Sequence, residues 1–278
     1  MKRLFVVLAA FAAIARPSAE ADKYEIYAVR FATIANFPVS SLVAGADRTR
    51  RMDIAMTIWV LKGNDGRIAL VDSGFHRDQY FKQYTVRDFV KPSDAIAPLG
   101  LSADNVTDLF ISHMHWDHAG GIDLFPNARV WIQKDEYDYY TGDAWQSPRT
   151  HGGIDPADVL EIVRRNTQGK VSFLRGDDET TISGVTFGIG GRHTWQSQFV
   201  TATTPKNTVV VLASDNMYLY ENLDTHRPIA QTLDAESNLR TQDRMKSLAS
   251  EVRLLIPGHD PSVFDRFPKV ADRIVRIE

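Results

Sequence analysis

Three histidines and an aspartate fall within six consecutive residues near the middle of the chain. The segment reads His113-Met114-His115-Trp116-Asp117-His118 and is followed by the pair Gly120-Gly121. Imidazole and carboxylate groups are common ligands of divalent transition metals, and so dense a group is typical of a metal site. In an extended segment, residues two positions apart point to the same side, so we expect His113 and His115 to bind one ion. We expect the turn that follows to bring Asp117 and His118 towards a second ion.

Two metal ions need more ligands than these four residues supply, so further histidines or aspartates are expected downstream. Three candidates each come within a few residues of an apolar run that predicts a strand, and these are His193, Asp215 and His259. Taken alone, any of them would more often be a capping or surface residue, but beside the central cluster each becomes a predicted ligand. Three other histidines follow no recognisable buried strand and are predicted not to be ligands: His76, His151 and His226. For His151, contact with a substrate is left open.

The elements that must position these residues are short apolar runs bounded by turn residues, which predict strands. The predicted strands are Tyr24 to Phe31, Met56 to Leu61, Arg67 to Asp72, Val106 to Ser112, Arg129 to Ile132, Val171 to Leu174, Val185 to Ile189, Gln198 to Ala202, Val209 to Ala213 and Arg253 to Ile256. Helices are predicted over Gln79 to Val90, from Ala119, from Lys134, and over Pro156 to Asn166 and Ser237 to Glu251. Two β-rich halves, each with helices, predict an α/β fold in which two sheets are covered by helices, an αββα sandwich.

The N-terminus has the features of a secretory signal peptide. Lys2 and Arg3 precede a twelve-residue apolar run from Leu4 to Ala15, and Ala19-Glu20-Ala21 offers small residues for cleavage. A helix of twelve residues spans about 18 Å, which is too short for a hydrocarbon core of roughly 30 Å. We therefore predict a signal peptide over residues 1–21, a periplasmic or secreted protein with no stable membrane anchor, and one domain over residues 22–278.

The composition of the chain excludes some kinds of metal site and makes some partners unexpected. The chain has no cysteine, so cysteine-containing zinc sites are excluded and stability must come from packing and any bound metal. The net charge of −3 and the isoelectric point near 6.2 give no broad basic field, so a nucleic-acid partner is not expected. A loop predicted over Asn36 to Asp53 carries a basic cluster at Arg48, Arg50 and Arg51 whose role is left open, as is the formation of a homodimer.

The chain resembles the metallo-β-lactamase superfamily. The likeness rests on Ser112-His113-x-His115-x-Asp117-His118-x-Gly120-Gly121 together with the earlier run Leu70-Val71-Asp72-Ser73-Gly74. Within the superfamily it is most similar to N-acyl homoserine lactone lactonases, because Tyr218 follows Asp215 by three residues. The resemblance implies that His113, His115 and His193 bind the first metal, that Asp117, His118 and His259 bind the second, and that Asp215 bridges the two. It also implies that Asp72 contacts the metal ligands and does not bind a metal itself.

The implied reaction is the opening of a lactone ring, with N-acyl homoserine lactones as the expected substrates. Two divalent ions roughly 3.5–4 Å apart can share a water and lower its pKa, so the expected nucleophile is a bridging hydroxide. Tyr218 is expected to donate a hydrogen bond to the developing oxyanion, and Asp117 to relay a proton to the leaving alkoxide. Zinc is expected first, with iron, manganese and cobalt as alternatives, because imidazole and carboxylate ligands accept all of them.

One stretch departs from the family pattern and leaves the substrate open. After His193 the chain reads Thr194-Trp195-Gln196-Ser197-Gln198, where the family usually has His-Thr-Pro-Gly-His. We therefore expect Trp195 and Trp116, which neighbour predicted ligands, to shape the pocket more than Phe37, Trp59 or Trp145. The alternatives within this fold are a glyoxalase-like thioesterase, a phosphodiesterase and a β-lactamase-like enzyme; a di-iron redox centre or a non-catalytic metal-binding module is the alternative from another class.

Overall fold

The computed structural model describes residues 21–147, 149–178 and 181–278. The predicted signal peptide lies outside these residues except for Ala21, so it stays a prediction. In the described part of the chain, none of the helices combines the length and the apolar character that a membrane span requires.

The first sheet has nine strands and is built mainly by the N-terminal half of the chain. Its strands are β1 (Tyr24–Pro38), β2 (Arg51–Gly63), β3 (Ile68–Val71), β4 (Val86–Arg87), β5 (Asp108–Phe110), β6 (Arg129–Gln133), β7 (Val171–Leu174), β12 (Lys269–Ala271) and β13 (Ile274–Arg276). Their order is β12-β13-β1-β2-β3-β5-β6-β7, with β4 paired to β1. The strands β3, β5, β6 and β7 run parallel, so their carboxyl ends meet at one edge of the sheet.

The second sheet has four strands in the order β11-β10-β9-β8. These are β8 (Val185–Ile189), β9 (Gln198–Thr203), β10 (Val209–Ser214) and β11 (Leu255–Pro257). Because β10 and β11 are parallel, the residues that follow them, among them Asp215 and His259, leave the sheet at the same edge.

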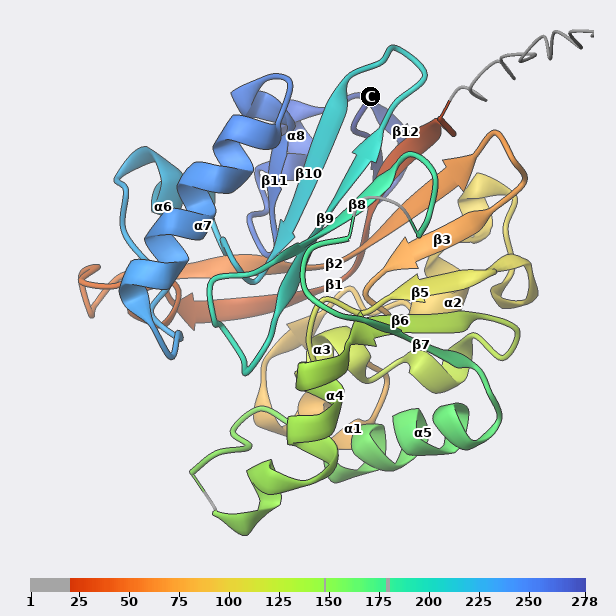
Figure 1. Ribbon diagram of the computed structural model, residues 1–278. Helices are drawn as coiled ribbons and strands as arrows, with labels where there is room; N and C mark the ends of the chain where they lie inside the picture. The colour runs from red at the N-terminus through yellow and green to blue at the C-terminus, as the bar shows by residue number, and fades with distance from the viewer. Residues whose placement is uncertain (1–20, 148, 179–180) are drawn as a thin grey trace, which may run out of the picture.

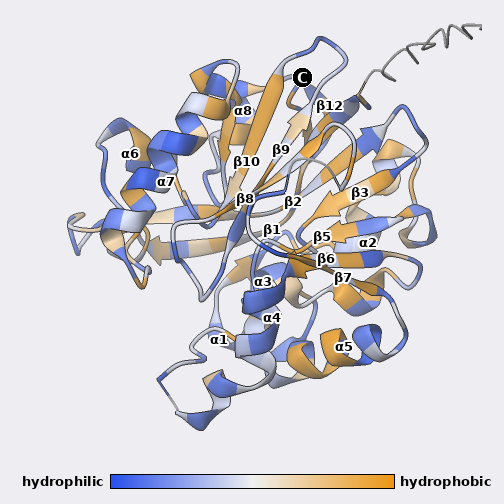
Figure 2. Ribbon diagram, in the orientation of Figure 1, coloured by the Kyte–Doolittle hydropathy of each residue, from blue (hydrophilic) through white to orange (hydrophobic). Residues whose placement is uncertain are grey.

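Eight α-helices lie on the outside of the two sheets in the described part of the chain. They are α1 (Asp78–Gln83), α2 (Pro92–Ala95), α3 (Trp116–Ala119), α4 (Lys134–Thr141), α5 (Pro156–Thr167), α6 (Tyr220–Asp224), α7 (Ala235–Leu248) and α8 (Val263–Arg266). Helices α4 and α5 lie beside β6 and β7, whereas α7 lies beside β10 (Figure 1). Apolar strands fill the centre and mainly hydrophilic helices surround them (Figure 2). The expected helix-covered sandwich of two sheets is confirmed.

The central strands of the first sheet are buried on both faces, and their side chains alternate between two cores. Ile58 and Val60 of β2 belong to the core beneath the helices, while Trp59 and Leu61 belong to the core between the sheets. This alternation is the two-residue period of a strand. It explains why the strand sequences read as continuous apolar runs rather than as alternating patterns.

Several predicted boundaries are wrong, and the longest error concerns the helix predicted over Gln79 to Val90. Only α1 is helical there, and Val86–Arg87 forms β4 against β1. The β-branched residues Thr85 and Val86 favour the extended form, and the Thr85 carbonyl accepts a hydrogen bond from Ala35 of β1. A tertiary pairing therefore ends the helix early.

Strand lengths and the loop between the first two strands also differ from the expectation. The loop predicted over Asn36 to Asp53 is shorter, because β1 continues to Pro38 and β2 begins at Arg51. Antiparallel pairing of the two strands, from Tyr24 opposite Gly63 to Pro38 opposite Arg51, accounts for this extension. The C-terminal strands β12 and β13, which the sequence did not reveal, complete the sheet beside β1.

The contact between Phe187 and Phe110 joins the two sheets and generates a prediction. The rings are buried and meet edge to face, with centroids 5.0 Å apart. We expect Phe187→Ala to lower the free energy of unfolding by about 3–5 kcal/mol, because it removes a large side chain from a closed core. Urea denaturation followed by circular dichroism measures the change. The control Leu160→Ala, at a residue that is 70% exposed, should change it by less than about 0.5 kcal/mol; similar losses in both variants would contradict this view of the core.

Candidate metal centre

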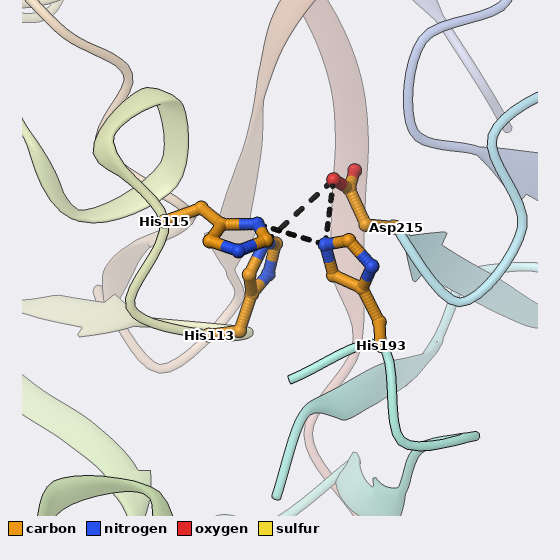
Figure 3. A group of neighbouring side chains, drawn as sticks. All are labelled: His113, His115, His193 and Asp215. Carbon is orange, nitrogen blue, oxygen red and sulfur yellow. Dashed lines mark hydrogen bonds and ion pairs between the residues drawn. The ribbon is translucent and has the colours of Figure 1, made fainter. Parts of the chain in front are cut away.

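Three histidines and one aspartate form the first group of converging side chains. His113 and His115 follow β5, His193 lies in the loop between β8 and β9, and Asp215 follows β10. Their candidate ligand atoms all lie within 4.8 Å of one another, which is close enough to bind one ion. His115 Nδ1 is 3.0 Å from His113 Nε2 and 2.8 Å from His193 Nε2, and Asp215 points into the same space (Figure 3).

Asp117, His118 and His259 form the second group. Their candidate ligand atoms also lie within 4.8 Å of one another. Asp117 and His118 belong to the short helix α3, which turns them away from the first group, and His259 follows β11. The Asp117 carboxylate oxygen Oδ2 is 3.5 Å from His118 Nε2 and 3.6 Å from His259 Nε2.

Asp215 lies between the two groups and presents one carboxylate oxygen to each. Its Oδ2 is 3.2 Å from His193 Nε2 and 3.6 Å from His113 Nε2. Its Oδ1 is 3.2 Å from His118 Nε2 and 3.0 Å from His259 Nε2. All seven predicted ligands are therefore brought together, in the two groups that the family resemblance implies.

The ring nitrogens that do not face the centre are held by other groups. His118 Nδ1 is 2.7 Å from Asp72 Oδ2, His193 Nδ1 is 2.7 Å from the Gln231 carbonyl, and His259 Nδ1 is 3.0 Å from the Ala55 carbonyl. These contacts place a proton on Nδ1 of each ring, so Nε2 is the nitrogen that faces the centre and can bind a cation.

Two of the atoms that face the centre are buried and, although they lie 3.2 Å apart, neither has a hydrogen-bond partner of suitable geometry among the described residues. They are His118 Nε2 and Asp215 Oδ1. Buried polar atoms normally form hydrogen bonds, so buried atoms without them that converge on one space indicate a ligand that is not part of the chain. A divalent cation satisfies both, and the donor set of imidazoles and carboxylates suits one. The residues present therefore fit the metals that the fold implies.

Charge differs between the two groups. Burial disfavours the charged forms of His118 and His259, but the carboxylates of Asp215 and Asp117 outweigh burial and raise the pKa of both imidazoles. Burial, followed by the neighbouring imidazoles, lowers the pKa of His115 to about 3 and holds that of His113 well below its ordinary value. Burial opposes the charge on Asp215, but the positive charges of His118 and His259 outweigh it and hold the pKa of that carboxyl well below its ordinary value. His113 and His115 thus offer unprotonated imidazoles beside the Asp215 carboxylate, which is the state that binds cations.

Asp72 fixes the strand ends from which the ligands project. This fully buried carboxylate accepts hydrogen bonds from the Ser112 amide at 2.8 Å, from the Ser214 hydroxyl at 2.9 Å and from His118 Nδ1 at 2.7 Å. It thereby joins the ends of β3, β5 and β10. Both Asp72 and Ser214 have positive φ, at 61° and 48°, so the chain turns sharply where each strand ends.

A cavity of about 400 Å³ opens above the two groups. Of the predicted ligands, His115, Asp117, Asp215 and His259 line it, and Tyr218 lines it beside them. The end of the first sheet and the loop that follows β1 supply an apolar wall made of Ile34, Phe37, Leu42, Ile54 and Met56. Helix α1, the residue that follows it and the loop before α5 supply further lining residues, which are Gln79, Tyr80, Gln83, Tyr84 and residues 152–156.

The aromatic residues singled out in the sequence divide between the cavity and other places. Trp116 and Phe37 line the cavity, and Trp116 stacks on Tyr80 with ring centroids 3.9 Å apart. Trp195 does not line it, so the expectation that Trp195 shapes the pocket is wrong. Trp195 is 37% exposed, and its ring stacks on Tyr139 with ring centroids 4.0 Å apart. This stacking holds the ring at the surface.

The histidines predicted not to be ligands lie outside both groups. His76 is 3.0 Å from Asp123, and His226 is 3.2 Å from Asp243. His151 stacks on Trp145 and is not among the residues that line the cavity.

Sequence reasoning missed residues that hold the ligand loops. The side-chain amide of Gln198 donates to the Ile111 carbonyl at 2.9 Å, and the backbone amide of Gln198 donates to the Ser112 carbonyl at 2.9 Å. These two hydrogen bonds connect β9 to the segment before His113. Gly153 lies against the His115 ring, and its carbonyl accepts from the Trp116 amide at 3.0 Å. The Gly152-Gly153 pair marked an unusual backbone in the sequence, but nothing local to it indicated His115 as the neighbour.

Comparison with known proteins agrees with this fold. The model of the metallo-β-lactamase superfamily matches residues 55–259, and the chain belongs to this superfamily of hydrolases. An N-acyl homoserine lactonase from Bacillus cereus is 26% identical over 223 residues, which cover 75% of this chain and 82% of the relative.

Two solved structures share the fold at low sequence identity. One is an N-acyl homoserine lactone hydrolase with the product N-hexanoyl-L-homoserine at its catalytic metal centre, with a TM-score of 0.73, 18% identity and coverage of 91% of this chain and 99% of that one. The other is AidC, a dizinc quorum-quenching lactonase, with a TM-score of 0.66, 17% identity and coverage of 92% and 97%.

The close approach of Gly153 to His115 generates a prediction. A Cβ atom at Gly153 would lie 2.8 Å from His115 Cδ2, and the backbone there has a φ of +78°. We expect Gly153→Ala to destabilise the fold by about 1–3 kcal/mol and to lower the metal content by displacing His115. Gly152→Ala is the matched control, because open space surrounds that position and its φ is ordinary. Thermal unfolding and elemental analysis compare the two, and equal behaviour would refute the proposed contact.

Proposed function

We propose that this protein opens lactone rings, with N-acyl homoserine lactones as the first substrates to consider. The observation that carries the proposal is the position of Tyr218, a buried phenol that lines the cavity beside both groups of ligands. The names of the Bacillus cereus relative and of the two solved structures support the same substrate class.

Two divalent cations are the proposed cofactors. His113, His115 and His193 would hold the first, Asp117, His118 and His259 the second, and Asp215 would contact both, as the two carboxylate oxygens of Asp215 suggest. Zinc is proposed because one structural relative is a dizinc enzyme. When bound, such a pair lowers the pKa of a shared water and so supplies hydroxide near neutral pH.

Tyr218 is proposed as the donor to the oxyanion. Its hydroxyl is 3.4 Å from His193 Nδ1, but that nitrogen donates its proton to the Gln231 carbonyl and so cannot accept another. The phenol proton is therefore free to point into the cavity. Burial, followed by the charges of Asp215 and Asp117, raises the pKa of Tyr218 well above its ordinary value, so the proton is retained at working pH. A donor held in this way stabilises negative charge as it develops on a carbonyl oxygen.

Asp117 is proposed as the proton carrier. Burial favours its neutral form, but the charges of His118 and His259 outweigh burial and lower its pKa, so it is an ionised base. It also lines the cavity, where substrate and water meet. A carboxylate in this position can take the proton of the attacking water and pass it to the departing alkoxide.

The cavity suits a small ester that carries an apolar chain. Its volume of about 400 Å³ lies within the usual range of small-molecule sites. The apolar wall beside β1 and β2 offers a surface for an acyl chain, and the amide side chains of Gln79, Gln83 and Gln231 offer partners for an amide group. No lysine or arginine occurs among the described residues that line the cavity, so it provides no fixed cation for a phosphate group.

The substrate class is tested with the zinc-loaded protein at pH 7 to 8. Short-chain and long-chain acyl homoserine lactones are compared with simple lactones, a thioester, a phosphodiester and nitrocefin. We expect the acyl lactones to turn over fastest and Asp215→Ala to abolish the activity, because that residue contacts both groups. If the lactones are inert while another substrate turns over, the proposed metal centre is retained and the proposed reaction is wrong.

Tyr218→Phe tests the donor role separately. Removing one oxyanion donor typically lowers kcat by roughly 100-fold or more, with a smaller effect on KM. We expect this pattern for lactone hydrolysis, with unchanged metal content, because Tyr218 is not in either ligand group. Tyr84→Phe is the matched control, since Tyr84 also lines the cavity but its hydroxyl accepts from Gln83. If kcat is unaltered in Tyr218→Phe, the proposed role of Tyr218 as a hydrogen-bond donor in the reaction is wrong.

A further inference from the structure

Glu136 is a fully buried carboxylate that belongs to neither ligand group. It lies in the first turn of α4 and is 0% exposed. Among the described residues it forms no ion pair with a lysine or arginine. Lys134, its neighbour on the helix, pairs with Asp138 instead. Burying a carboxylate is unfavourable unless hydrogen bonds compensate for the lost water, so the partners of Glu136 show what it holds.

Three donors from two distant segments surround the Glu136 carboxylate. The Met114 amide donates to Oε1 at 3.0 Å, and the Thr194 hydroxyl donates to the same oxygen at 2.7 Å. The Gln196 amide donates to Oε2 at 2.7 Å. Hydrogen bonds to an ionised group are shorter and stronger than neutral ones, so this arrangement fixes both segments relative to α4.

These segments carry the histidines of the first group. Met114 lies between His113 and His115, and Thr194 directly follows His193. One carboxylate therefore restrains the backbone beside all three imidazoles, although it touches none of the ligand atoms. The second group has supports that do not involve Glu136, because Asp72 holds His118 and the Ala55 carbonyl holds His259. Asp72 also accepts from the Ser112 amide beside His113.

We propose that Glu136 is a positioning residue that sets the metal affinity of the first group and leaves that of the second group unchanged. The inference rests on the proposed binding of two cations but not on the identity of the substrate. Supporting residues outside the ligand set typically change metal affinity by about 10- to 100-fold when they are replaced. Because the carboxylate acts through the backbone of two loops, its loss should loosen three ligands together.

Glu136→Gln is the discriminating substitution. It keeps the length and nearly the volume of the side chain, but replaces one acceptor oxygen with an amide group that only donates. Either the Gln196 amide or the Met114 amide then faces a donor and loses its partner, whereas the Thr194 hydroxyl can rotate and accept. Asp138→Asn is the matched control on the same helix, because Asp138 is exposed and contacts Lys134 away from the metal centre.

The two groups are separated by testing Glu136→Gln in two backgrounds. His259→Ala weakens the second group, so the remaining tight zinc reports on the first, and His193→Ala does the reverse. Zinc affinity is measured by competition with a chromophoric chelator in the full chain. We expect Glu136→Gln to weaken zinc binding about 10- to 100-fold in the His259→Ala background and to leave it unchanged in the His193→Ala background. Asp138→Asn should change neither.

Equal weakening in both backgrounds, or none in either, would overturn the proposal, since a general loss of stability does not distinguish the two groups. If Glu136→Gln does not fold, Thr194→Val decides, because it removes one hydrogen bond and retains the carboxylate. Selective weakening of the first group by Thr194→Val supports the proposal, and unchanged affinity overturns it. A wild-type chain that binds no zinc would instead refute the proposed cofactors, which separates the two failures.

Discussion

The carboxylate of Asp215 is the contact on which the arrangement of the site depends. It is buried, it is ionised, and each of its oxygens faces imidazoles of a different group. A buried charge of this kind is tolerated only where opposite charge or strong donors surround it. The ends of β5, β8, β10 and β11 must therefore meet around a single point, and the two sheets can pack only in the register that allows this.

Two other buried carboxylates near the centre are likewise surrounded by hydrogen-bond donors. Asp72 is a second buried carboxylate, and it binds the ends of three strands together through serine and histidine donors. Glu136 is a third, and it binds two loops through backbone amides and a hydroxyl. Each replaces its lost water with several donors, and each restrains a different part of the centre. Polar residues in this core therefore specify geometry at positions where apolar packing alone would leave the loops free.

The sequence predicted which side chains converge, because these residues follow a local rule. His113 to His118 form a dense motif, and His193, Asp215 and His259 each come within a few residues of an apolar strand, so short-range patterns were sufficient to find all seven. The αββα sandwich followed from the order of predicted strands and helices.

What the sequence did not reveal depends on contacts between distant segments. No pattern in the sequence distinguishes Glu136 from its acidic neighbours at the start of α4, and Trp195 was predicted to be a pocket residue because it neighbours a ligand. The pairing of β4 with β1 ended the helix that was predicted to continue to Val90. In each case a partner more than forty residues away decides the outcome, and no periodicity within a short window carries that information.

The division of the ligands between the sheets has a consequence for folding. His113, His115, Asp117 and His118 follow a strand of the first sheet, whereas His193, Asp215 and His259 follow strands of the second. A cation bound by either group would cross-link the two layers in a chain that has no cysteine for a disulfide. Because such a link exists only in the folded state, the binding free energy adds to stability by mass action. The concentration of free metal in the surroundings would then act as a thermodynamic variable that sets how firmly the two halves of the protein hold together.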